Sequence, residues 1–172
     1  MLEYAPGWED PEVLSKYLNE IFKYDPDNIY ATLILACTQD VFWGKITDTV
    51  FEKLNNLSSK DPEILSMIEL AKAWYYKCKD NNELYEQHLL SSISHCNKHV
   101  ENYKSIAYLY AEKGKKDEAK KFAEKALHNV QVVFTQDSSI TDITDVEKFI
   151  NEYFKGTHIT EPNLESIYEL LG

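Results

Sequence analysis

Apolar residues recur three and four positions apart through most of the chain, which is the period of an α-helix. Proline and glycine, which interrupt helices, number five each, and no proline lies between Pro62 and Pro162. Strand signals are weak: the best is the stretch 130–135, and residues 138–144 after it look like loop. The pattern therefore predicts an all-α protein.

Short local signals mark where the helices begin and end. Asp10 and Asp61 each precede a proline, which is the order of an N-cap and a first helical position. Gly114 follows a helical stretch, as a C-terminal cap does. We predict a lone helix at 10–24, then helix pairs at 29–58, 62–97 and 100–130, and two further helices at 144–155 and 161–171.

Two series of apolar and small residues alternate along the chain with a period of 34 to 36 residues. One series contains Val50, Leu54 and Leu57, then Tyr85, Leu89 and Ser92, then Ala119, Ala123 and Ala126. The other contains Ile34, Cys37, Thr38 and Val41, then Ile68, Ala71, Lys72 and Tyr75, then Tyr103, Ile106, Ala107 and Tyr110. Two types of helix therefore alternate, and each pair buries its apolar face by stacking on a neighbour.

This repeated helix pair resembles the tetratricopeptide repeat family. The segment 103–127 fits the family pattern best, because it carries the aromatic, small and turn residues Tyr103, Ala107, Tyr110, Gly114 and Ala119. Two earlier repeats depart from the pattern, since Thr38 and Lys72 stand at its small, glycine-like position. The resemblance implies a right-handed solenoid of helical hairpins over 10–130. Within a single domain of residues 1–172, we expect 131–172 to form a loop and two capping helices.

The resemblance also implies where a partner binds. Family members usually bind a peptide or a partner protein on a concave surface lined by the first helix of each pair. The positions on that surface predict partner-binding residues, which are Gln39, Phe42, Glu69, Tyr76, Lys104 and Tyr108. Aromatic anchors beside polar neighbours are typical of protein interfaces. Only Lys104 suits a clamp for a C-terminal carboxylate, so the chain does not resemble the branch of the family that binds chaperone tails.

The charge narrows the choice of partner. The chain has 29 acidic residues and 18 basic ones, all of them lysine, and its net charge is −11. An acidic chain without arginine is poorly suited to bind nucleic acid. Residues 101–130 carry seven lysines against five acids, but acids interleave with the lysines, so we interpret them as a solvated helix face. A basic partner would therefore meet the acidic segments 1–60 and 131–172.

Catalytic and metal-binding motifs are missing from the sequence. There is no phosphate-binding glycine loop and no nucleophile elbow. His95 and His99 lie one turn apart around Cys96, but we place them at a helix end, where histidine complements the helix dipole. We therefore predict no catalytic residue, no cofactor and no metal site.

Three classes of function stay open at this point. The first is a non-catalytic protein–protein interaction module, for example an adaptor or a chaperone. The second is an acidic inhibitor of a basic toxin or nuclease, an immunity or antitoxin type of protein, because charge steers such association. The third is an enzyme or a metal protein, which the missing motifs disfavour.

The location follows from what the sequence lacks. The first ten residues are acidic and contain no apolar core of a signal peptide. Three cysteines do not make a disulfide framework, and no apolar stretch is long enough to span a bilayer. We expect a soluble, cytoplasmic protein that binds neither membrane nor nucleic acid. Its oligomeric state stays open, and the unpaired first helix offers one place for a second copy to bind.

Overall fold

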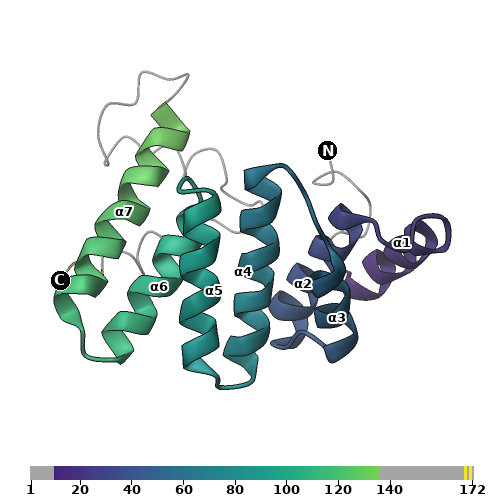
Figure 1. Ribbon diagram of the computed structural model, residues 1–172, viewed down its shortest axis with the longest axis horizontal. Coiled ribbons are helices and arrows are strands. Elements are labelled where there is room, and N and C mark those ends of the chain that lie inside the picture. Colours follow the sequence, from purple (N-terminus) through teal and green to yellow (C-terminus); the bar gives the residue numbers. More distant parts are fainter. Residues whose placement is uncertain (1–9, 136–168, 170, 172) are drawn as a thin grey trace. The chain divides into compact units, whose positions relative to one another are not determined.

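The structure is a computed structural model that describes residues 10–135, 169 and 171. Those residues form α-helices and no strand, which confirms the all-α class. The helices are α1 (Pro11–Tyr24), α2 (Ile29–Trp43), α3 (Asp48–Asn56), α4 (Pro62–Cys78), α5 (Asn82–His95), α6 (Val100–Glu112) and α7 (Lys116–Thr135), as Figure 1 shows. The two helices expected at 144–155 and 161–171 lie outside the described residues, apart from 169 and 171.

The two helix starts predicted at Asp10 and Asp61 are confirmed, and the weak strand signal is wrong. The Asp10 carboxylate accepts a hydrogen bond from the backbone of Glu12 at 2.8 Å, and Asp61 accepts one from Glu63 at 2.8 Å. Residues 130–135 continue α7 instead of forming a strand. No glycine or proline interrupts them, and extending an existing helix requires no new nucleus.

The same tight turn closes two helical hairpins. Asp80 joins α4 to α5 and Gly114 joins α6 to α7, with backbone φ angles of +54° and +73°. In each turn the following residue donates its N–H to the carbonyl five residues earlier, at 3.0 and 2.8 Å. The two turns are 34 residues apart, which is the sequence period. Gly114 therefore acts as the predicted cap, and Asp80 adopts the same left-handed conformation without being glycine.

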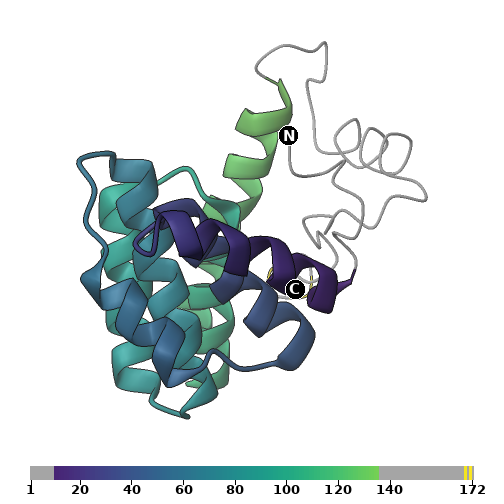
Figure 2. The same ribbon diagram turned by 90° about the vertical axis from the view of Figure 1, so that its right-hand side faces the viewer.

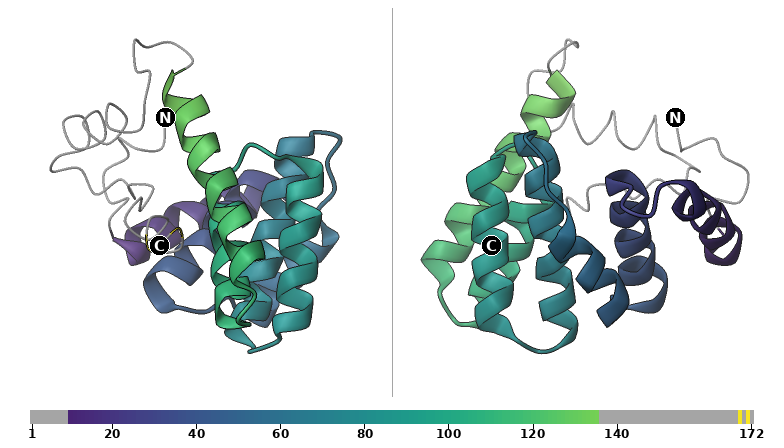
Figure 3. Two further views of the ribbon diagram at one scale, coloured as in Figure 1. Left: turned by 90° about the vertical axis from the view of Figure 1, so that its left-hand side faces the viewer. Right: turned by 45° about the vertical axis from the view of Figure 1, so that its right-hand side comes forward.

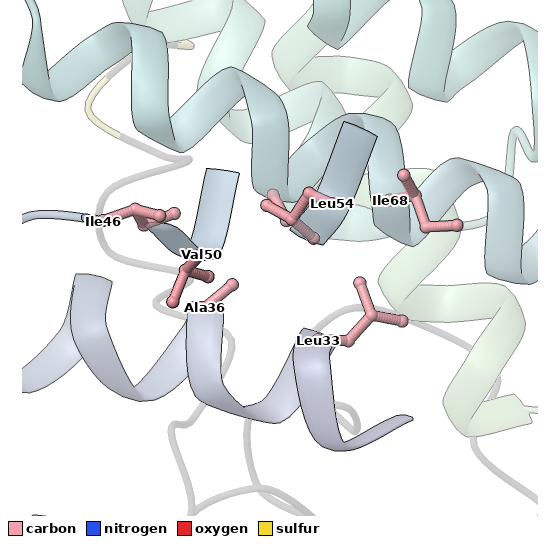
Figure 4. Close-up of a cluster of buried hydrophobic side chains, with 7 residues drawn as sticks. Leu33, Ala36, Ile46, Val50, Leu54 and Ile68 are labelled. Carbon is pink, nitrogen blue, oxygen red and sulfur yellow. The ribbon is translucent and has the colours of Figure 1, made fainter. Parts of the chain in front are cut away.

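The chain divides into two compact units, Met1–Cys96 and Asn97–Gly172. In the first unit, α2, α3 and α4 share an apolar core whose side chains point toward one another in Figure 4, including Leu33, Ala36, Val50, Leu54 and Ile68. Helix α4 packs along α5 (Figure 3). Helix α1 packs on α2 through Leu14, Leu18 and Ala31, and Figure 2 shows α1 nearest the viewer.

In the second unit, α6 packs on α7. Helix α7 buries small residues against it, and these are Ala119, Ala123, Ala126 and Val130. Each has a buried counterpart 34 positions earlier: Tyr85, Leu89 and Ser92 in α5, and Cys96, which caps that helix. The first of the two alternating series therefore corresponds to buried faces in α5 and α7. No helix in the described part of the chain is long and apolar enough to cross a membrane.

Candidate interaction surface

The six predicted binding residues divide between the two units. Gln39, Phe42, Glu69 and Tyr76 belong to the first unit, and Lys104 and Tyr108 to the second. Phe42 alone among them is exposed, with 46% of its surface accessible. Gln39 is buried, and the other four are half-buried.

Gln39 serves the interior of the fold. Its side-chain oxygen accepts hydrogen bonds from the backbone N–H of Thr47 at 2.8 Å and from the Thr47 hydroxyl at 3.1 Å. Thr47 is the N-cap of α3, so Gln39 holds the start of that helix against α2. We therefore leave Gln39 out of the candidate surface.

The burial of α2 also differs from the predicted one. The repeat series placed Cys37 and Val41 on the packed face, but both are exposed, while Leu33 and Ala36 are buried. Helix α2 is apolar almost all round. Apolar spacing alone therefore does not identify which of its faces is buried.

Glu69 belongs to an ionic network between α4 and α5. Its carboxylate receives a hydrogen bond at 3.0 Å from the Lys72 ammonium and lies 2.8 Å from Nδ1 of His88. All three side chains keep less than a fifth of their surface accessible. The His88 hydrogen bond, supported by Lys72, lowers the pKa of Glu69 to about 2. Glu69 is thus an ionised link between two helices.

Tyr76 lies in an aromatic cluster, which we define as Phe51, Tyr75, Tyr76 and His88 of α3, α4 and α5. Phe51 stacks on Tyr75 with ring centroids 3.8 Å apart, and Tyr76 meets Phe51 edge-on at 5.3 Å. On its other side, Tyr76 stacks on His88 at 5.2 Å. Contacts on both sides fix the orientation of the Tyr76 ring before any partner binds.

A polar rim borders this cluster. The Tyr75 hydroxyl donates to the Asp48 carboxylate at 2.9 Å, and the Lys79 ammonium reaches the same carboxylate at 2.9 Å. The hydrogen bond from Lys79 is the main cause that lowers the pKa of Asp48, and it also raises the pKa of Lys79. The rim therefore stays charged at neutral pH.

The end of α2 contacts the end of α4, the helix that also carries Tyr75 and Tyr76 of the aromatic cluster. The Cys78 thiol, at the end of α4, donates to the carbonyl of Gly44, which caps α2, at 3.4 Å. Just before Gly44 are three exposed apolar residues that we name the α2 apolar end: Val41, Phe42 and Trp43. Tyr76 is two residues before Cys78, so the α2 apolar end and the cluster occupy the same end of the first unit.

Exposed apolar side chains gather on α1 and α2. Nine large apolar side chains are exposed in the described part of the chain. Seven belong to these two helices, and they are Tyr17, Ile21, Tyr24, Tyr30, Val41, Phe42 and Trp43. None belongs to α6 or to residues 116–130 of α7. Val41, Phe42 and Trp43 are consecutive, and a group of exposed apolar side chains is typical of a binding site in a soluble protein.

The sequence prediction missed most of this surface, although one signal was present. The α1 residues 17, 21 and 24 follow the helical spacing of four and three, beside the buried Leu14 and Leu18. Together these residues form an apolar face on α1 that is wider than the face a helix buries when it packs on a single neighbour.

The two predicted residues of the second unit lie on α6. The Lys104 ammonium pairs with Glu101 at 2.6 Å, one turn earlier on the same helix, and keeps 19% of its side-chain surface accessible. Tyr108 is half-buried one turn further along. Neither residue belongs to the concentration of exposed apolar side chains in the first unit.

The histidines considered as metal ligands lie at helix ends. His95 is the last residue of α5, and His99 precedes the first residue of α6. No three histidine, cysteine or acidic side chains within the described ranges are placed to hold a metal ion.

Comparisons with known proteins give no match, whether with protein-family models, with curated protein sequences or with solved structures. The function of the chain is therefore argued from its own residues and contacts.

Proposed function

We propose that the chain is a non-catalytic interaction module that binds a protein or peptide through its first unit. The contact surface consists of the α2 apolar end together with Tyr76. The observation that carries the proposal is the run of three adjacent exposed apolar side chains at the end of α2, Val41, Phe42 and Trp43. The repeated turn at Asp80 and Gly114 supports a tetratricopeptide-like stack over 10–130, the arrangement that the sequence suggests.

The composition of this surface suits binding. Phe42 and Trp43 are exposed aromatic anchors, and aromatic residues carry much of the energy of protein interfaces. Tyr76 is held by stacking on His88, so it loses little freedom when a partner binds. Charged Asp48 and Lys79 supply the polar rim that interfaces usually have.

The test compares matched exposed side chains. Phe42→Ala with Trp43→Ala removes the α2 apolar end, while Met67→Ala with Leu90→Ala removes similar exposed side chains from α4 and α5. Each variant serves as bait for affinity capture from a lysate of the native cells, after circular dichroism confirms its helicity. We expect the first pair to lose the partner and the second to keep it. Equal capture by both pairs would place the binding surface elsewhere.

A further variant tests whether the second unit takes part in binding. Tyr108→Ala changes a predicted binding residue of that unit. Loss of the partner in Tyr108→Ala, with capture kept in the Phe42 and Trp43 variant, would assign binding to the second unit. We expect Tyr108→Ala to keep the partner and the Phe42 and Trp43 variant to lose it.

The charge of the first unit supports a second candidate, an acidic inhibitor of a basic protein. Residues 1–96 hold sixteen acids and eight lysines, a net charge of −8. Such a field speeds the encounter with a basic partner, and salt screens it. Once the partner is captured, the association rate should fall steeply between low salt and about 0.5 M salt. An association rate that does not change with salt would rule this candidate out.

We also propose that the protein acts in a reducing compartment such as the cytoplasm. Its three cysteines, Cys37, Cys78 and Cys96, are not paired in disulfides with one another. Free thiols are the usual state of cysteine in that environment.

A further inference from the structure

Helix α2 leaves open a face that the corresponding positions of α4 bury. Four α2 residues fall within about 60° of one another around the helix, and they are Tyr30, Ile34, Cys37 and Val41. Tyr30 is 64% exposed, Val41 is 58% exposed, and Cys37 is exposed as well. Ile34 is partly covered by its contact with the α1 cluster. We call these four residues the α2 open face.

The same positions are packed in α4. Thirty-four residues further along, which is the period of the sequence, they are Ile64, Ile68, Ala71 and Tyr75. The two middle residues are buried, with 2% and 1% of their surface accessible, and the outer two pack against the same apolar core. Helices α2 and α3 supply the side chains that cover this face of α4.

Only one of those two covering helices has a counterpart at α2. Helix α3 covers α4 with Val50 and Leu54, and α1 presents Leu14 and Leu18, 36 positions earlier, to α2. In Figure 1, α1 lies on the side of α2 away from α4. Among residues 10–96, no helix holds on α2 the place that α2 holds on α4. The α2 open face is therefore the position of one missing helix.

We propose that the α2 open face binds an amphipathic helix of a partner protein, in the place of that missing helix. This inference rests on the proposed function, since it names the kind of segment through which a partner contacts the first unit. Val41 belongs to both the α2 open face and the α2 apolar end, so the two contacts are continuous. A helix laid on an apolar face is a common mode of recognition.

The cover that α2 gives to α4 shows which residues such a helix needs. Helix α2 packs on the shared core with Ile29, Leu33 and Ala36, which are spaced by four and then three positions. That spacing places two large apolar side chains and one small one on a single helical face. The partner helix therefore carries an apolar stripe of this kind and is polar on its other side.

Charge complementarity indicates the sign of that polar side. Residues 10–96 hold fourteen acids and eight lysines, a net charge of −6. The only charged residue of α2 is Asp40, and Asp25 and Asp27 lie just before the helix. An acidic helix would be repelled by this field, whereas a helix with lysine or arginine on its polar side is attracted. The occupant is thus a basic amphipathic helix.

Three synthetic peptides of 15 residues, the length of α2, serve as probes. The first copies the α2 spacing, with leucine at the positions of Ile29 and Leu33, alanine at that of Ala36, and lysine on the polar side. The second has glutamate in place of lysine, and the third has the composition of the first in scrambled order. We expect the full chain to bind the lysine peptide at least about tenfold more tightly than either of the others.

Matched double variants locate the site. Tyr30→Gln with Val41→Gln changes the α2 open face, while Met67→Gln with Leu90→Gln changes exposed apolar residues of α4 and α5 without altering the charge. The first pair should bind the lysine peptide at least about tenfold more weakly than the wild type, and the second pair should bind it equally. Circular dichroism checks that both keep their helicity.

Cys37 reports on the α2 open face without any substitution. The rate at which N-ethylmaleimide alkylates it, followed by mass spectrometry, should fall at least about tenfold when the lysine peptide saturates the chain. The scrambled peptide should leave that rate unchanged. The Phe42 and Trp43 variant should still bind the lysine peptide, so failure here is distinct from failure of the proposed function.

Several results would overturn the proposal. Equal binding of the lysine and glutamate peptides would exclude a basic occupant. An equal effect of the two double variants, or alkylation of Cys37 that no peptide slows, would exclude the α2 open face. Protection of Cys37 without peptide would mean that the chain covers this face itself, and protection that grows with protein concentration would identify a second copy as the occupant.

Discussion

Glu69 offers the sharpest test of the link between α4 and α5. Its carboxylate bonds to His88 and Lys72, and these contacts hold its pKa at about 2 against an ordinary 4.5. That difference corresponds to at most about 3 kcal/mol of stability. Because the side chain keeps some contact with water, screening reduces the contribution to about 1–2 kcal/mol. Glu69→Gln keeps the shape of the side chain and removes its charge.

The pH dependence has a definite sign. The pKa of Glu69 is lower in the folded state than in the unfolded one, so the carboxylate stabilises the fold fully above about pH 4.5. This contribution is lost as the pH falls from 4.5 toward 2. We therefore expect Glu69→Gln to be less stable than the wild type by about 1–2 kcal/mol at pH 7 and nearly equal to it near pH 2.

Urea unfolding followed by circular dichroism, at pH 7, 4.5 and 3, measures this difference. Glu52→Gln is the matched control, because Glu52 is exposed in the middle of α3 and forms no ion pair or side-chain hydrogen bond with residues 10–135. The free energy of unfolding of Glu52→Gln should equal that of the wild type at every pH. A Glu69→Gln variant as stable as the control at pH 7, or one whose deficit is the same at pH 7 and pH 3, would refute the reasoning.

Four further substitutions test the packing and the turns by thermal or urea unfolding. Leu54→Ala should destabilise the fold by about 2–5 kcal/mol, because Leu54 is fully buried in the core of α2, α3 and α4. Asp80→Gly should stabilise the fold and Gly114→Ala should destabilise it, each by roughly 1 kcal/mol, because both positions have a positive φ that glycine adopts more readily. If the two substitutions changed the stability in the same direction, this explanation of the turns would be wrong. Gln39→Ala should cost about 1–2 kcal/mol by removing the acceptor that holds Thr47, with exposed Gln87→Ala as the neutral control.

Much of the fold was predictable because its signals are local. An aspartate before a proline fixes a helix start within four residues, and Asp10 and Asp61 both act as predicted. Gly114 marks the turn that joins α6 to α7. The buried faces of α5 and α7 follow the repeated spacing, and Tyr85 occupies a position that is alanine in the next repeat. Local chemistry therefore determines where these helices lie along the chain.

The candidate surface depended on contacts that the sequence does not reveal. Glu69 and His88 are 19 residues apart, and Phe51 and Tyr75 are 24 apart, on different helices. Nothing in the spacing of α4 distinguishes a partner-facing Tyr76 from one that stacks on His88. Only the packing of α3, α4 and α5 brings these side chains together.

Helix α2 shows how one segment serves both the core and the surface. Gln39 points inward to hold the start of α3, while Phe42, less than a turn later, is exposed. A helix that is apolar on all sides is normally covered on all sides. The same chain also makes an amphipathic helix, because α7 buries alanines on one face and exposes lysines on the other. The exposed apolar surface of α2 is therefore a property of that helix and does not follow from the amino-acid composition of the whole chain. The proposed binding of a partner explains this surface better than composition does.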